Sequence, residues 1–292
     1  MSATARHRGH AGNAVATIGT FDGVHVGHQR LIDETRRQAA ATGLPAVAVT
    51  FDRHPMAIVR PGSAPRLLTG LDHKLELLRA RQVDVVVLEF DATLAAESAE
   101  DFVRTVLVDR FGVRGLVVGS SFRFGHRHRG DVALLESMGA SLGFSVTAIE
   151  LVVDDAAHTV VSSSFIRALV DGARLDEARR LLGREHEVRG ALVAAGQGSI
   201  AIPAELLVPP AGEYRVLWST GRATGTGVGR VLVPKGGDTT AIELFRDRGI
   251  SGDGAPADLV DGEKIALRFV APISPAPDLG RSRPTSRSWD RR

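Results

Sequence analysis

The sequence predicts an α/β protein in which a doubly wound parallel β-sheet is followed by a small antiparallel β-barrel. Up to about residue 186, short apolar strands alternate with amphipathic helices, which is typical of a parallel sheet with crossover helices. Beyond it, short β-type runs are broken by Gly and Pro, as in small barrels. The 292 residues, 43% of them hydrophobic and 24% charged, have an ordinary globular composition and leave room for two domains.

The first strand is expected over residues 14–18 and the helix after it over 28–41. That helix should end at Gly43, because glycine accepts the left-handed conformation that closes many helices. The alternation continues with strands at 46–51, 83–90, 115–119 and 145–152 and with helices at 71–81, 99–111 and 131–142. Right-handed crossovers would join these strands into one sheet, whose ligands bind beyond the carboxyl ends of the strands.

Two further short helices, 162–170 and 175–182, lead into the second part of the chain. Its strands are expected at 191–195, 214–219, 229–233, 241–245 and 265–270. We therefore divide the chain into a sheet domain (14–186), a barrel domain (187–275) and a basic, disordered tail (276–292).

Composition excludes several classes of protein. The chain has no cysteine, so it has neither disulfides nor a thiolate metal site or nucleophile. No apolar run approaches the roughly 20 residues of a membrane helix. Residues 1–13 lack the apolar core of a signal peptide, which favours a cytoplasmic location.

The net charge is +2, yet the last twelve residues contain five arginines and one aspartate. That segment is therefore +4, and the rest of the chain is −2. Such a tail can contact nucleic acid. The favoured interpretation is a solvated terminus rich in Arg, Ser and Pro, without a nucleic-acid partner.

The strongest functional signal is the stretch 17–28, Thr-Ile-Gly-Thr-Phe-Asp-Gly-Val-His-Val-Gly-His. A strand runs into a glycine-bearing turn, and His25 and His28 follow where a helix begins. Gly27 would let the backbone approach a phosphate, to which the helix N-terminus offers free N–H groups and its positive dipole end. The two histidines can donate hydrogen bonds to the same group as charge builds on it. Nucleotidyl or phosphoryl transfer needs this positioning and charge stabilisation. The spacing alone also fits a metal pair or an ordinary loop.

The whole stretch resembles the signature of the HxGH-type nucleotidyltransferases, and its Gly-x-Phe-Asp-Gly-Val-His form resembles the bacterial FAD synthetases. That family comprises bifunctional riboflavin kinase/FMN adenylyltransferases. Similar blocks follow in the family's order: Thr-Phe-Asp-Arg-His-Pro at 50–55, Leu-Leu-Thr at 67–69 with Lys74, Gly-Ser-Ser-Phe-Arg-Phe-Gly at 119–125 with Arg-Gly-Asp at 129–131, and Val-Ser-Ser-Ser-Phe-Ile-Arg at 161–167. The resemblance covers residues 14–186 and implies a Rossmann-like nucleotidyltransferase domain.

The resemblance implies a reaction in which FMN attacks the α-phosphorus of Mg–ATP, giving FAD and pyrophosphate. It implies catalytic roles for His25, His28 and Arg167. The implied ATP-binding residues are Gly19, Thr20, Phe21, Asp22, Gly27, Ser163 and Ser164. The implied flavin-binding residues are Phe51, His54, Pro55, Ser121, Phe122, Phe124 and Asp131, although core packing is favoured for at least two of the three phenylalanines. Mg²⁺ would bridge phosphate oxygens with few protein ligands, and the sequence names none.

Two residues depart from the family pattern. Ser121 stands where the family usually has Asn or Asp, and Arg53 replaces the usual proline before His54. Both changes fall in the implied flavin-binding blocks. They are either neutral or favour an analogue of FMN as the acceptor.

The second domain resembles the riboflavin kinase of the bifunctional enzymes at residues 182–184 and 188–190, but it lacks the kinase motif Pro-Thr-Ala-Asn. Because that motif supplies polar groups for ATP and Mg²⁺, we expect no kinase activity. Glu243 falls where the kinase base would be, and a surface strand residue is the favoured interpretation.

The sequence thus favours an FMN adenylyltransferase with a degenerate kinase-like barrel. One alternative is a nucleotidyltransferase that uses CTP or a modified flavin phosphate. The other is a non-catalytic regulator that binds a flavin or a nucleotide. The sequence predicts no membrane partner and leaves the oligomeric state open.

Overall fold

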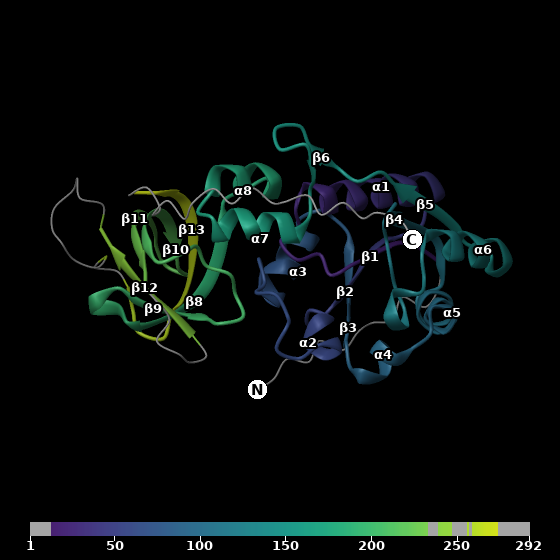
Figure 1. Cartoon of the computed structure of the whole chain (residues 1–292), viewed down its shortest axis with the longest axis horizontal. Helices are drawn as coiled ribbons and strands as arrows, with labels where there is room; N and C mark the ends of the chain where they lie inside the picture. Colours follow the sequence, from purple (N-terminus) through teal and green to yellow (C-terminus); the bar gives the residue numbers. More distant parts are fainter. Residues whose placement is uncertain (1–12, 233–238, 247–255, 257–258, 274–292) are drawn as a thin grey trace, which may run out of the picture.

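The structure, a computed structural model, describes residues 13–232, 239–246, 256 and 259–273. It has two parts, a parallel sheet with its helices and a closed barrel (Figure 1). Between them lie α7 (Ser163–Asp171) and α8 (Leu175–Leu182). The predicted fold class is confirmed.

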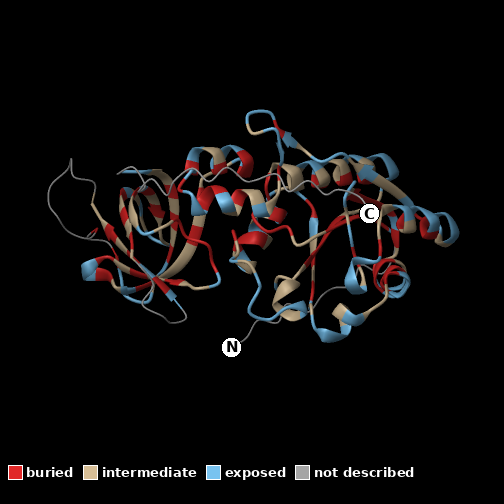
Figure 2. Ribbon diagram, in the orientation of Figure 1, coloured by how far each residue is buried: buried red, intermediate tan, exposed pale blue. Residues whose placement is uncertain are grey.

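The sheet contains five parallel strands in the order β3-β2-β1-β4-β5. Their bounds are β1 (Ala14–Ile18), β2 (Ala46–Phe51), β3 (Asp84–Leu88), β4 (Val113–Gly119) and β5 (Ser145–Ile149). Every residue of β1 is buried, as expected for a strand covered on both faces. Figure 2 shows buried residues along the strands of the sheet and along the strands of the barrel.

The order of the strands decides where a ligand can bind. The chain passes from β1 to β2 on one side and later returns to β4 on the other side of β1. The crevice between β1 and β4 is therefore the topological switch point of the sheet, beyond whose carboxyl edge open α/β sheets bind ligands.

The helices match the predicted pattern with shifted ends. They include α1 (Val26–Thr42), α3 (Leu71–Arg79), α5 (Ala99–Asp101) and α6 (Val132–Leu142). After α5 the chain continues as η1 (Phe102–Arg110), which is wound as a π-helix. In the described residues of the sheet part, three short helices were not predicted: α2 (Met56–Val59), α4 (Ala92–Ala96) and η2 (His126–His128). Nor was the hairpin of β6 (Val153–Asp154) and β7 (Thr159–Val160).

The barrel closes in the order β10-β11-β12-β9-β8-β13. Its elements are β8 (His186–Ala194), η3 (Ala195–Gln197), β9 (Ser199–Pro203), β10 (Gly212–Ser219), β11 (Thr224–Val231), β12 (Thr239–Phe245) and β13 (Lys264–Pro272). The prediction missed β9, a short strand whose alternate residues Ile200 and Ile202 are fully buried. The last residue of the predicted strand 229–233 and the predicted tail 276–292 lie outside the described residues.

The barrel contacts the sheet part through the segment before α3 and through α3 itself. Leu67 forms a parallel bridge with Leu206, and Arg189 of β8 pairs with Glu76 of α3 at 2.7 Å. Among the described residues, none of the helices combines the length and the apolar character needed to span a bilayer.

Candidate functional site

The blocks singled out in the sequence follow different strands of the sheet but reach the same edge. The turn from Gly19 to His25 follows β1, His54 comes three residues after β2, and Ser121 comes two residues after β4. Because all these strands are parallel, their carboxyl ends share one edge. The candidate site is thus at the switch point, where ligands bind in such sheets.

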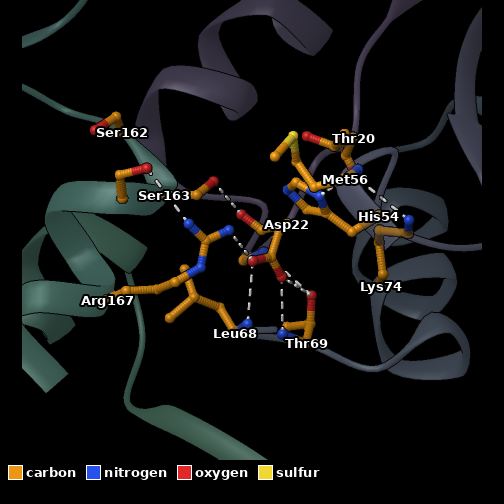
Figure 3. Close-up of polar contacts among 12 residues, drawn as sticks. Thr20, Asp22, His54, Met56, Leu68, Thr69, Lys74, Ser162, Ser163 and Arg167 are labelled. Atoms are coloured by element: carbon orange, nitrogen blue, oxygen red, sulfur yellow. Dashed lines mark hydrogen bonds and ion pairs between the residues drawn. The ribbon is translucent and has the colours of Figure 1, made fainter. Parts of the chain in front are cut away.

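Asp22 joins three segments at this edge (Figure 3). Its carboxylate accepts hydrogen bonds from the backbone N–H groups of Leu68 and Thr69, both at 3.1 Å. Arg167 of α7 donates to the same carboxylate at 2.9 Å, and both side chains are largely buried. This contact network, which we call the Asp22 cluster, fixes the β1 turn against α7.

The N-terminus of α7 faces the same turn. Ser162 caps the helix by accepting from Phe165 N–H, and Ser163 donates its hydroxyl to the Asp22 carbonyl oxygen at 2.8 Å. Ser164 is exposed and lies 3.4 Å from an Arg167 nitrogen. A second helix N-terminus therefore lies beside the first, and both can present N–H groups to an anion.

His25 is the N-cap of α1, because its Nδ1 accepts a hydrogen bond from His28 N–H at 3.3 Å. The ring must then carry its proton on Nε2, which leaves an N–H donor on that side. Burial lowers the pKa of His25 to about 4, and the charges of Arg184 and Arg167 act in the same direction. At neutral pH His25 is an uncharged hydrogen-bond donor.

His28 stacks on His25 with ring centroids 3.6 Å apart and meets the edge of Phe21 at 5.2 Å. Burial lowers its pKa well below the usual value, and the neighbouring His25 and Lys74 add to that shift. Its Nδ1 is buried without a hydrogen-bond partner in the described part of the chain. The stacked rings leave little space over the helix start, and a Cβ at Gly27 would lie 3.2 Å from the His25 ring.

The backbone of the β1 turn is held by buried neighbours. Phe21 is fully buried in an apolar cluster, so its side chain anchors the turn from inside. Gly19 N–H donates to the Val49 carbonyl oxygen at 3.1 Å, and the Thr20 carbonyl oxygen accepts from Thr50 at 3.2 Å.

Lys74 lies near the Asp22 cluster (Figure 3). It borders a small cavity there. Its ammonium group donates to the carbonyl oxygens of Phe51 at 2.8 Å and Thr20 at 3.2 Å. Burial lowers the pKa of Lys74 to about 8, opposed by the charges of Asp22 and Asp52. The cavity measures about 20 Å³, roughly the room of one water molecule. It is lined by Thr20, Asp22, Asp52, Arg53, His54, Leu67, Thr69, Leu71 and Lys74.

His54 reaches this cavity from the end of β2, and Pro55 follows it without lining the cavity. His54 is partly buried, and its Nδ1 accepts from Met56 N–H at 3.2 Å. Burial lowers the pKa of His54, with a further contribution from the charge of Arg167. Pro55 begins the short helix α2, whose first turn it closes with its carbonyl oxygen.

The remaining predicted flavin-binding residues differ in how far they face solvent. Ser121 is exposed, while Phe51 and Phe122 are partly buried beside the sheet core. Phe124 is buried within that core and stacks on Phe122 at 5.6 Å. Asp131 caps α6 through Leu134 N–H and pairs with Arg123. The structure thus gives Phe124 a packing role and Asp131 a capping role.

The sequence prediction quoted Thr69 and Lys74 but gave them no role, and the structure brings both into the site. The sequence signal for both residues was the family-like block 67–74. This block is far from the β1 turn in the sequence, so its contact with the turn could not be predicted. The described residues contain no group of three or more His, Cys, Asp or Glu side chains arranged to hold a metal.

Buried histidines should make the stability depend on pH. Burial lowers the pKa of His25, His73 and His186 to about 4 each. An unfolded histidine titrates near 6.5, so between about pH 6.5 and 4 the unfolded chain binds more protons than the folded one. The free energy of unfolding should fall on acidification through this window and stay level between about pH 7 and 8, above which the lowered pKa of Lys74 makes it rise further.

Urea unfolding at several pH values measures this dependence. Each such histidine contributes at most about 1.4 kcal/mol per pH unit. His73→Gln should therefore make the slope shallower without removing it. A stability that stays constant down to about pH 5 would contradict the assigned burial.

Comparison with known proteins adds an independent finding. The FAD synthetase family model matches residues 7–165. The chain is 39% identical over 185 residues to the bifunctional riboflavin kinase/FMN adenylyltransferase of Pseudomonas fluorescens, covering 63% of this chain and 57% of that protein. It is 34% identical over 180 residues to that of Escherichia coli strain K12, with 61% and 57% covered. The match thus spans less than three fifths of the length of these relatives.

A solved structure shares the fold. The crystal structure of a macrolide-efflux protein from Streptococcus pneumoniae superposes with a TM-score of 0.73 at 21% identity, covering 91% of this chain and 86% of that one. This likeness concerns the fold alone. The family match covers more than half of the chain and contains the β1 turn, the Asp22 carboxylate and both histidines. The chain belongs to the FAD synthetase family.

Proposed function

We propose that the protein is an FMN adenylyltransferase, which transfers AMP from ATP to FMN and releases pyrophosphate. One observation carries the proposal: the N-termini of α1 and α7 meet at the Asp22 cluster, at the switch point of the sheet. Two helix N-termini, a buried arginine and two neutral histidines suit a chain of phosphates. The family match and the names of the relatives support the same substrates.

In the proposed reaction an oxygen of the FMN phosphate attacks the α-phosphorus of ATP. The new bond joins the two phosphates of FAD, while the bond between the α- and β-phosphates breaks and its electron pair leaves with pyrophosphate. A phosphate monoester has a second pKa near 6 and is mostly ionised at neutral pH, so the attack needs no general base. This agrees with the low pKa of His25, which makes it a donor and not a proton acceptor.

We assign the protein's part to charge stabilisation. The Nε2–H of His25, the His28 ring and the first N–H groups of α1 would stabilise charge on the reacting phosphate. Arg167, with Ser163 and Ser164, would hold the departing pyrophosphate. Both Asp22 oxygens already accept hydrogen bonds, so Asp22 is not assigned as a metal ligand. Mg²⁺ would enter as its complex with ATP and neutralise phosphate charge.

For the acceptor FMN, we propose a binding site made of residues at and just after the ends of β2 and β4. Phe51, His54, Pro55, Ser121 and Phe122 lie at least partly open at the carboxyl edge of the sheet and would contact FMN. Phe124 and Asp131 would act indirectly, by packing under Phe122 and by capping α6.

We also propose that the barrel lacks riboflavin kinase activity. Glu243 lies on the outer side of β12, between the buried Ile242 and Leu244. Arg230 pairs with it at 3.4 Å and with Glu213 at 2.8 Å. Arg230 therefore already binds the Glu243 carboxylate, the group that would act as the kinase base. We also propose that the sheet domain ends at residue 186 and the barrel domain begins at residue 187. We further propose that the protein is cytoplasmic.

An assay with purified protein tests these assignments together. With Mg–ATP and FMN we expect equimolar FAD and pyrophosphate, whereas riboflavin with Mg–ATP should give no FMN. CTP in place of ATP should give no product, so a cytidylyl product would identify CTP as the donor. Binding of FMN and ATP without turnover would instead support the regulator, and steady formation of FMN would overturn the assignment of the barrel.

A further inference from the structure

The turn that carries the catalytic histidines has a strained backbone. Phe21 and Val24 have φ of 49° and 40°, in the left-handed region. Bulky and β-branched residues rarely adopt that region, and such conformations persist only where the surroundings over-determine them. His25 follows Val24 directly, so whatever fixes this turn also fixes the two histidines.

Much of that restraint comes from the sheet part. Gly23 N–H donates to the Thr69 hydroxyl at 3.1 Å, and the Asp22 side chain is held by the Asp22 cluster. The Gly23 and Val24 carbonyl oxygens accept hydrogen bonds from side chains outside the turn. Neither is satisfied from within the turn, so their partners decide whether its second half stays in place.

Arg184 supplies the partner of Gly23. It lies between α8 and the first barrel strand, β8, and its Nη2 donates to the Gly23 carbonyl oxygen at 2.9 Å. Its Nη1 donates to the carbonyl oxygen of Leu182, the last residue of α8, at 3.2 Å. The two nitrogens of one planar guanidinium thus connect the turn to the end of α8.

Gln29 of α1 completes the arrangement. Its side-chain amide donates to the Val24 carbonyl oxygen at 2.9 Å and to that of Leu182 at 3.1 Å. Leu182 also packs against the turn, because a Cβ on Gly23 would lie 3.2 Å from its side chain. The end of α8 is therefore bonded to the turn through both Arg184 and Gln29.

The chain just after Arg184 is held by α3 and the barrel. Glu187, three residues further along, lies 3.4 Å from His73 of α3 and pairs with Arg268 of β13 at 3.2 Å. The chain around Arg184 is thus held between α8, α3 and the barrel. A free surface arginine would lose much side-chain entropy on binding one carbonyl, but this one lies in a prearranged position.

We propose that Arg184 is a positioning residue for adenylyl transfer, which holds the Gly23 carbonyl so that His25 and His28 keep their places. The segment that leads from α8 into the barrel would thereby complete the nucleotidyl-transfer site. The proposal rests on the proposed function for its kinetic part and on the contacts alone for its structural part.

The test compares Arg184→Ala with Arg179→Ala, a matched loss of an exposed arginine that pairs with Glu185. In Arg184→Ala, amide hydrogen exchange of residues 21–28 should accelerate about tenfold or more, while barrel peptides stay unchanged. The kcat for FAD formation should fall about 100-fold, the scale of a misplacement near 1 Å, with little change in KM for ATP. Arg179→Ala should resemble wild type in both measurements.

Arg184→Lys provides the second variant, in case the alanine variant does not fold. Lysine keeps the charge but loses the planar fork that reaches two carbonyls, so kcat should fall to an intermediate value. Unchanged exchange at residues 21–28, or an unchanged kcat, would overturn the proposal. A wild type that makes no FAD would refute the proposed function instead, and the exchange measurement would still decide whether Arg184 holds the turn.

Discussion

Replacing His28 by alanine should lower kcat for FAD formation by roughly two to three orders of magnitude, the usual scale for one preorganised charge-stabilising donor. The ring stacks on His25 at 3.6 Å, in the first turn of α1. In the proposed reaction, its removal takes away a group that stabilises charge in the transition state. Binding of ATP should change much less, because the helix N-terminus and Arg167 are left in place.

The measurement is steady-state kinetics with Mg–ATP and FMN, combined with ATP titration of the variant. His158→Asn is a suitable control, because His158 is exposed on the β6–β7 hairpin and asparagine tolerates its left-handed backbone. If the His28→Ala variant has the turnover of wild type, His28 does not stabilise the transition state.

Replacing Arg167 by alanine should cost both stability and turnover. Its ion pair with Asp22 is 2.9 Å long, and the two side chains are only 12% and 4% exposed. The variant would leave the Asp22 carboxylate buried without its counter-charge. Breaking a buried pair in this way costs about 3–5 kcal/mol, here toward the lower end because two backbone N–H groups still donate to the carboxylate.

Urea unfolding measures the loss, and two further variants interpret it. Arg81→Ala breaks a more exposed pair with Asp33 and should cost about 1 kcal/mol or less. The double variant Asp22→Asn with Arg167→Met removes both charges and should recover part of the stability but none of the activity. An Arg167→Ala variant as stable as wild type would show that the pair does not fix the turn.

The sequence by itself determined the fold class and most elements of the sheet part. Strands such as Ala14–Ile18 and Ala46–Phe51 were predicted to the residue, because a strand buried on both faces reads as a continuous apolar run. The His-x-Gly-His stretch was located because a glycine turn before a helix is a local pattern. Helix ends were less certain: α1 begins at Val26 because the His25 side chain caps it.

Only the tertiary structure decided which residues meet at the turn. Asp22 contacts Leu68, Thr69 and Arg167, which lie between 46 and 145 positions away, and Arg184 reaches Gly23 over 161 positions. Such contacts depend on the order of the strands and on the docking of α7, α8 and the barrel, which no local pattern encodes. The same packing lowers the pKa of Lys74 and of His25, because burial disfavours their charged forms. The sequence supplied the chemical groups, and long-range packing set their partners and protonation.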